Sequence, residues 1–156
     1  MKKNTKVCMV ASCGGHIMEL MQLLPAVVGK DYYFVTERNV ASEGMMQKHR
    51  HYYLKQQQRR GVSFAFVFTL NIFLSLVYFI KERPTTIITT GAGASYPTCK
   101  IAKLFGRKII YVESFAKLNN ESVTGRMVYP FADVFFVQWP EMRQVYPNAR
   151  YEGTVY

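Results

Sequence analysis

Twice in this chain, a short run of β-forming residues ends in a glycine-rich turn. The first run, at residues 6–11, leads into SCGGH at residues 12–16, and the second, at residues 86–90, leads into GAGAS at residues 91–95. In an open α/β sheet, such turns lie at the carboxyl ends of strands, where backbone amides and a helix N-terminus can approach a phosphate. Two turns of this kind favour a diphosphate site, although neither completes a nucleotide-binding fingerprint.

Apolar strands alternate with helical patterns along the rest of the chain. Besides the two runs above, we expect strands at 32–36, 52–54, 108–113 and 134–137, and helices at 16–28, 62–80 and 96–105. The other residues between 37 and 61 are polar and basic, which is typical of a loop. The alternation predicts an α/β fold, a Rossmann-like parallel sheet with helices on both faces, and 156 residues suit a single domain.

The charge balance favours an anionic partner. The chain has 20 Lys and Arg against 10 Asp and Glu, a formal net charge of +10. Nucleic acid is a weak candidate, because no groove-reading or base-stacking motif is present. The three cysteines lack CxxC spacing, and Walker A and HExxH motifs are absent, so we expect reduced thiols, no metal and no cofactor.

The strongest hydrophobic run, residues 62–80, is nearly long enough to span a bilayer, which takes roughly 20 apolar residues. Strands on both sides of the run should belong to one sheet, so its two ends must lie on the same side of any membrane. Burial of this helix within the protein is one interpretation. We favour the other, in which the helix lies in the membrane interface with its basic flanks on anionic headgroups. The residues expected to contact lipid are Phe64, Phe66, Phe68, Phe73 and Phe79.

Two side chains are candidates for acid–base chemistry. His16 begins a predicted helix, where a neutral imidazole can accept a proton, although an isolated histidine more often caps or packs. Glu113 ends a predicted strand, a position that often reaches into a ligand crevice. The polar loop after Glu113 suits sugar hydroxyls and phosphate, or is an ordinary solvated loop.

Four blocks of sequence together resemble a known family: SCGGH, ERPTTIITTGAGASYP, RKIIYVESFAKLNNESVTGR and YPFADVFFVQWPEM with the final YEGTVY. They are similar to bacterial exopolysaccharide and capsule proteins related to the membrane-anchoring subunit of the two-part UDP-GlcNAc transferase of dolichol-linked oligosaccharide synthesis. That family corresponds to the N-terminal half of a GT-B glycosyltransferase. The resemblance therefore implies one acceptor-binding domain over residues 1–156, with a membrane-associating helix at about 62–82.

The resemblance also implies roles for particular residues. His16 matches a histidine that is a candidate for the catalytic base, and Glu113 matches a loop carboxylate near the acceptor sugar, which would orient that sugar or act as the base instead. The expected acceptor and diphosphate ligands are Ser12, Gly14, Gly15, Gly91, Gly93, Ala94, Ser95, Asn119 and Arg126. A GT-B enzyme binds its nucleotide sugar mainly in its C-terminal domain, so a separate small donor-binding subunit is implied. The segment of this chain that would bind that subunit is expected at about 141–156, with Tyr151, Gly153, Val155 and Tyr156 as contacts.

The expected function is that of an acceptor-binding, membrane-recruiting subunit that is inactive alone. With its partner it would transfer a sugar from a UDP-sugar to a polyprenyl-diphosphate-linked saccharide, in exopolysaccharide or capsule synthesis. Its expected location is peripheral, on the cytoplasmic face of the plasma membrane. The alternative is a non-catalytic membrane scaffold that only activates a partner glycosyltransferase.

Overall fold

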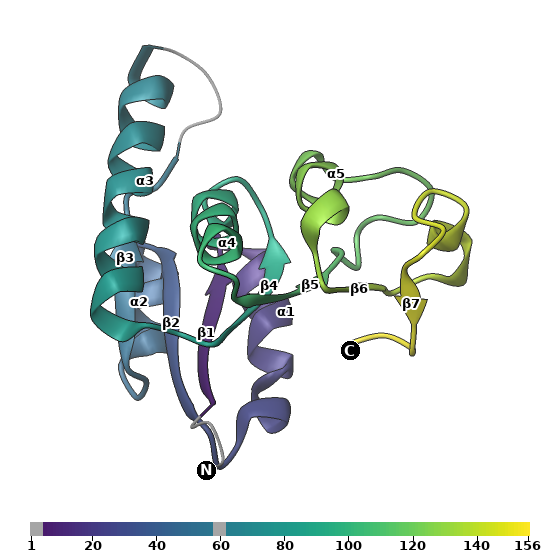
Figure 1. The fold of residues 1–156 in the computed structure, drawn as a ribbon, viewed down its shortest axis with the longest axis horizontal. Coiled ribbons are helices and arrows are strands. Elements are labelled where there is room, and N and C mark those ends of the chain that lie inside the picture. The colour runs from purple at the N-terminus through teal and green to yellow at the C-terminus, as the bar shows by residue number, and fades with distance from the viewer. Residues whose placement is uncertain (1–4, 58–61) are drawn as a thin grey trace.

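A computed structural model of the chain describes residues 5–57 and 62–156 and contains one seven-stranded sheet (Figure 1). The strands are β1 (Lys6–Ala11), β2 (Asp31–Glu37), β3 (His51–Leu54), β4 (Thr86–Gly91), β5 (Lys108–Val112), β6 (Val134–Val137) and β7 (Arg150–Tyr151). They are ordered β3-β2-β1-β4-β5-β6-β7, and every neighbouring pair is parallel. The direction in which successive strands are added therefore reverses between β1 and β4, which is where open α/β sheets bind ligands.

Helices cover both faces of the sheet. They are α1 (Gly15–Gln22), α2 (Val40–Met46), α3 (Val62–Glu82), α4 (Ser95–Leu104) and α5 (Val123–Val128). Alternate residues of β1 point to opposite faces: Cys8 and Val10 join the core beneath α3, α4 and α5, whereas Val7 and Met9 join the core beneath α1 and α2. The expected Rossmann-like sheet with helices on both faces is confirmed.

One expected helix is shorter in the structure, and the helices α2 and α5 and the strand β7 were not expected. The helix predicted at 16–28 ends at Gln22 and is followed by a separate 3₁₀ turn, Leu24–Val27, because Pro25 lacks the amide that a continuing helix needs. The segment predicted as loop contains α2, which begins with a capping box between Asn39 and Ser42. The short α5 was not expected; its N-cap is Ser122, whose hydroxyl accepts from the amide of Gly125.

Helix α3 packs its polar stripe inward. Asn71 is fully buried, and its amide side chain both accepts from and donates to the backbone of Lys55, at 2.9 Å each. Tyr78 donates to the carbonyl of Tyr53, and Glu82 accepts from Tyr52 and Lys6. Polar anchors thus attach α3 to β3 and to the start of β1, and the apolar side of the helix is left outward.

The outward side of α3 includes most of the phenylalanines expected to contact lipid. Phe64, Phe66 and Phe73 are exposed and Phe68 is partly exposed. Phe79 is the exception: it is only 5% exposed, with its ring 5.0 Å from that of Phe105, so its prediction as a lipid contact is wrong. Figure 1 shows α3 along one side of the domain, with its N-terminal turns extending beyond the carboxyl ends of the strands.

Candidate functional site

The two glycine turns lie side by side at the carboxyl edge of the sheet. They follow the adjacent strands β1 and β4, and the amide of Ser12 donates to the carbonyl of Gly91 at 3.5 Å. Gly91 has a φ of +93°, and a Cβ there would collide with the hydroxyl of Tyr111, so only glycine fits. Gly14, Gly15 and Gly93 are exposed, which leaves the backbone of both turns open to a ligand.

His16 connects the first glycine turn to strand β4. Its Nδ1 lies 2.8 Å from the carbonyl of Thr90, and the hydroxyl of Thr90 donates to the carbonyl of His16 at 2.6 Å. Since a carbonyl only accepts, we assign the proton of a neutral ring to Nδ1. Nε2 then has a free lone pair, and within residues 5–57 and 62–156 no hydrogen-bond partner occupies it. This tautomer is the one that a general base requires.

Glu113 is placed differently from the prediction. It immediately follows β5 and is 1% exposed. Oε1 accepts from the amide of Ser114, and Oε2 accepts from the amide and hydroxyl of Ser122 and, at 2.8 Å, from the hydroxyl of Tyr146. With both oxygens engaged inside the protein, this carboxylate is suited to holding the loop 114–122 and not to abstracting a proton from a substrate.

Tyr146 is a residue that the sequence did not single out. Burial and the nearby carboxylate of Glu113 raise the pKa of its hydroxyl, so it stays a hydrogen-bond donor. Gly125 closes the other side of this arrangement, because a Cβ there would collide with Oε2 of Glu113. The carboxylate is therefore enclosed by Ser122, Gly125 and Tyr146.

A second buried carboxylate, Glu19 of α1, was also not expected. Its Oε1 accepts from the hydroxyl of Ser114 and from the amide of Phe115, both at 3.1 Å. Burial raises the pKa of Glu19, against the opposing effects of these hydrogen bonds and of His16. The helix that begins at the first glycine turn is thereby bonded to the loop after β5.

A third, Glu37, ends β2 and supports the first turn from the other side. Its Oε2 lies 3.3 Å from the amide of Cys13 and 3.4 Å from the thiol, and Oε1 accepts from the amide of Gln57. Burial and the charge of Glu37 both raise the pKa of the Cys13 thiol, so the thiol stays protonated. An acidic residue at a strand end is a weak sequence signal that would have indicated Glu37, whereas Glu19 lies within α1 and has no such signal.

The remaining predicted ligands divide into two groups. Ser12, Ala94 and Ser95 are buried, and the hydroxyl of Ser95 donates to the carbonyl of Ala92 within the second turn. Asn119 and Arg126 are exposed, and Arg126 forms an ion pair of 3.2 Å with Glu121. The structure therefore brings the two turns and His16 together, and places Asn119 and Arg126 on the surface of the loop and helix that follow β5.

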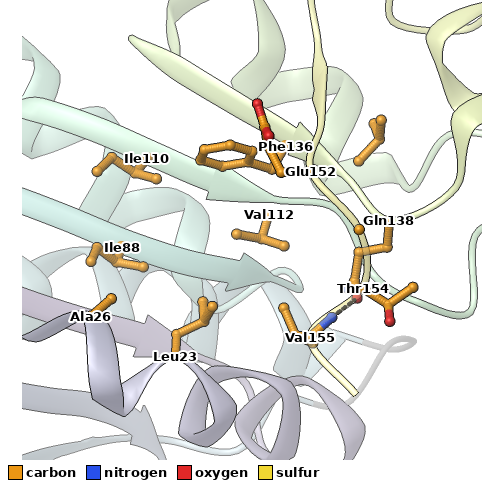
Figure 2. A pocket seen from close by; sticks show the side chains of 12 residues that line it. Leu23, Ala26, Ile88, Ile110, Val112, Phe136, Gln138, Glu152, Thr154 and Val155 are labelled. Carbon is orange, nitrogen blue, oxygen red and sulfur yellow. Dashed lines mark hydrogen bonds between the residues drawn. The ribbon is translucent and has the colours of Figure 1, made fainter.

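The C-terminal segment crosses an apolar hollow on the α1 side of the sheet. A cavity of about 300 Å³ lies between branched side chains of β4 and β5, Leu23 beyond α1, and residues 152–155. Figure 2 shows the side chains that line it. Gly153 and Val155 line this cavity, and Tyr151 and Tyr156 are exposed. Tyr156 also lies edge-on against Phe115, at 5.4 Å between ring centroids.

Comparison with known proteins identifies relatives across the whole chain. The model of the family "Oligosaccharide biosynthesis protein Alg14 like" matches residues 7–155. The UDP-N-acetylglucosamine transferase subunit ALG14 of Rattus norvegicus is 25% identical over 99% of this chain and 84% of the relative, and that of Candida albicans is 26% identical over 90% and 73%. The subunit of Schizosaccharomyces pombe is 40% identical over a shorter stretch, 46% of this chain and 37% of the relative.

Solved structures share the fold. MurG of Acinetobacter baumannii superposes with a TM-score of 0.72 at 17% identity, covering 88% of this chain and 42% of MurG. UDP-GlcNAc 2-epimerase of Neisseria meningitidis, bound to UDP-GlcNAc, superposes with a TM-score of 0.74 at 9% identity, covering 97% and 47%. The chain thus spans less than half of each, and the expected N-terminal-type GT-B domain is confirmed as a fold.

Proposed function

Because the chain belongs to the Alg14-like family of oligosaccharide biosynthesis proteins, we propose that it is the acceptor-binding subunit of a two-component UDP-sugar glycosyltransferase. Relatives that match 99% of this chain are named as subunits of UDP-N-acetylglucosamine transferase. A GT-B enzyme is completed by a second domain that binds the nucleotide sugar, and here that domain belongs to a separate donor-binding subunit. The proposed acceptor is a polyprenyl-diphosphate-linked sugar; the capsule or exopolysaccharide context rests on the sequence resemblance alone.

The observation that supports this proposal is the side-by-side arrangement of the two glycine turns with His16 between them. The exposed backbone of both turns and the N-terminus of α4 offer donors and partial positive charge to a diphosphate. Nε2 of His16 takes the proton of the acceptor hydroxyl as its oxygen attacks the anomeric carbon of the UDP-sugar, and UDP leaves with the bonding electrons. Glu113 serves as a positioning residue that holds the loop 114–122.

The apolar side of α3 supports peripheral binding to a membrane. The helix is long and apolar enough to cross a bilayer, but its polar anchors hold it against the sheet. We place its outward face in the lipid interface, with exposed Lys81 and Arg83 near anionic headgroups at its C-terminal end. The preceding Arg59 and Arg60 lie outside the described residues. The acceptor's lipid would reach the turns from the cytoplasmic face of the membrane on which α3 rests.

Docking of the partner is proposed at about residues 141–156. Exposed Tyr151 and Tyr156 flank residues that line the apolar cavity, and that face of β4 and β5 beyond α1 is apolar. Aromatic side chains beside an apolar hollow are typical of protein interfaces. A partner bound to residues 141–156 would face the carboxyl edge of the sheet from the side on which these residues lie.

The experiment is sugar transfer in a reconstituted system. The chain and the partner that co-purifies with it are mixed with a radiolabelled UDP-sugar and a short-chain polyprenyl diphosphate acceptor. His16→Gln should lower kcat by about 10²-fold or more, as expected for loss of a general base. His49→Gln is the control, because the ring of His49 lies beside Tyr32 and Phe34 on the α2 side of the sheet. Transfer by the chain alone, or an unchanged kcat in His16→Gln, would refute this assignment.

A scaffold that only activates a partner is distinguished by a second variant. Gly15 is exposed, has no positive φ, and would accept a side chain without a clash, as would Gly44 on α2. If the first turn binds the acceptor, Gly15→Val should raise KM for the lipid acceptor, whereas Gly44→Val should leave it unchanged. Wild-type KM in both variants would favour the scaffold.

A further inference from the structure

A buried glutamine joins the C-terminal segment to the loop after β5. Gln138 is the first residue beyond β6 and is only 2% exposed. Its side-chain oxygen accepts from the amide of Val155 at 3.0 Å, as Figure 2 shows, and its Nε2 donates to the carbonyl of Glu113 at 2.9 Å. One side chain therefore holds both Val155 and Glu113, the residue just before the loop 114–122.

Further hydrogen bonds from Gln138 and Trp139 reinforce the link between the end of β6 and residues 113–115. The same Nε2 lies 3.5 Å from Oε2 of Glu19, whose other oxygen holds Ser114 and Phe115. The indole of Trp139 donates to the carbonyl of Phe115 at 2.6 Å. Residues 113–115 are thus bonded to α1 and to the end of β6, and through Gln138 to the C-terminal segment.

The far end of the loop is fixed by Glu113 itself. Its carboxylate holds Ser122, which caps α5, so both ends of the loop 114–122 depend on the position of residue 113. The middle of the loop, residues 118–120, is exposed. A shift of Gln138 would therefore alter the anchorage of the whole loop while the sheet stayed in place.

Glutamine is suited to this position because a neutral amide offers a donor and an acceptor together. Val155 needs an acceptor for its amide, and Glu113 needs a donor for its carbonyl. A glutamate at 138 would supply no donor and would add a carboxylate beside Glu19. An apolar side chain would leave both backbone groups without their present partners, which is costly in a buried setting.

We propose that Gln138 is a positioning residue that couples the C-terminal segment to the loop 114–122. When a partner docks on residues 152–156, this contact orders the loop that faces the acceptor, so the acceptor site is completed only in the assembled transferase. The identity of the partner and the role of the loop rest on the proposed function. The coupling within the chain does not depend on it.

The test removes one hydrogen-bond donor, the backbone amide of Val155. Val155→Pro has no amide to donate to Gln138, whereas the matched control Val155→Ala keeps it. Amide hydrogen exchange of the isolated chain is followed in peptides covering 113–122, with peptides from α4 as an internal reference. Val155→Pro should speed exchange of the loop about fivefold, the factor that corresponds to one net hydrogen bond of about 1 kcal/mol. Val155→Ala and the α4 peptides should match wild type.

Gln138→Met identifies the route. It keeps the side-chain length but neither hydrogen bond, so it should reproduce the faster exchange, and Val155→Pro should add nothing in that background. Equal loop exchange in Val155→Pro and Val155→Ala would overturn the coupling. An undiminished effect of Val155→Pro in Gln138→Met would assign the coupling to Tyr156 and Phe115, and would overturn the role of Gln138. Neither result depends on partner, sugar or lipid, so failure here is distinct from failure of the transfer assay.

Discussion

Replacing the most exposed phenylalanines of α3 should release the protein from membranes without unfolding it. Phe66 is 74% exposed and Phe73 is 61% exposed, so neither side chain contributes much to the core. The double variant Phe66→Ser, Phe73→Ser removes apolar surface that only an external partner can bury. Its free energy of unfolding should stay close to that of wild type, since surface substitutions usually change it by less than about 0.5 kcal/mol.

The size of the effect follows from the exposed area. With about 200 Å² for a phenylalanine side chain, the exposed fractions of Phe66 and Phe73 correspond to about 150 and 120 Å². At about 25 cal/mol per Å², complete insertion of both would be worth about 6–7 kcal/mol. A helix lying in the interface inserts only partly, so half of this value, about 3 kcal/mol, predicts binding that is about a hundredfold weaker.

Flotation with vesicles of phosphatidylcholine and phosphatidylglycerol measures this partition. The matched control is Val40→Ser, because Val40 is 88% exposed but lies on α2, on the opposite side of the sheet. If the double variant floats as well as wild type and Val40→Ser, the outward face of α3 does not contact lipid. If wild type itself remains with the soluble fraction at every lipid concentration, the membrane proposal is wrong for the whole chain.

Three further predictions concern the residues that hold the fold and the site in place. Asn71→Ala should lower the free energy of unfolding by about 2–4 kcal/mol in urea titrations, because both backbone groups of Lys55 lose their partner, while Thr69→Ala on the exposed side should have little effect. For Glu82, burial raises the pKa, but hydrogen bonds from Tyr52 and Lys6 and the charge of Arg50 outweigh burial and lower the pKa below 4.5. Its stabilisation is therefore present above the unfolded pKa and lost as the pH falls through the folded one, so Glu82→Gln should show a shallower loss of stability than wild type below about pH 4.5. Tyr146→Phe removes one of the three donors at Oε2 of Glu113 and should raise KM for the lipid acceptor while leaving KM for the UDP-sugar unchanged; an unaltered acceptor KM would separate Glu113 from the acceptor-facing loop.

Much of the fold was predictable because its signals are local. The strand at Val134–Val137 and the two glycine turns follow from apolar runs and from residues that permit tight turns. The long helix over residues 62–80 was also expected, and in the structure it continues two residues further, to Glu82. The missed helices, α2 and α5, are seven and six residues long and begin with capping side chains that periodicity does not register. The strand β7, which was also missed, has only two residues.

The function of individual acidic residues was not predictable in the same way. The sequence indicated Glu113 as a possible base, but whether a carboxylate faces a crevice or its own loop depends on Ser122, Gly125 and Tyr146, which are 9 to 33 positions away. Glu19 and Gln138 were not predicted as site residues, since their partners lie at residues 113–114 and at Val155, far away in the sequence. Long-range hydrogen bonds of this kind leave no period or spacing in a sequence.

The amino-acid pattern by itself determined a parallel α/β sheet, two phosphate-suited turns and a helix too apolar for an ordinary surface. Only the tertiary structure decided which side of that helix is hidden, and it hides the polar one, because Asn71, Tyr78 and Glu82 find backbone and charged partners on neighbouring strands. Packing likewise decided that, among the described residues, one ring nitrogen of His16 has no hydrogen-bond partner, while the carboxylates of Glu19, Glu37 and Glu113 bind groups of the protein itself. The physical reason is that burial and hydrogen-bond partners are set by contacts between distant segments, whereas strand and turn formation depends mainly on neighbouring residues.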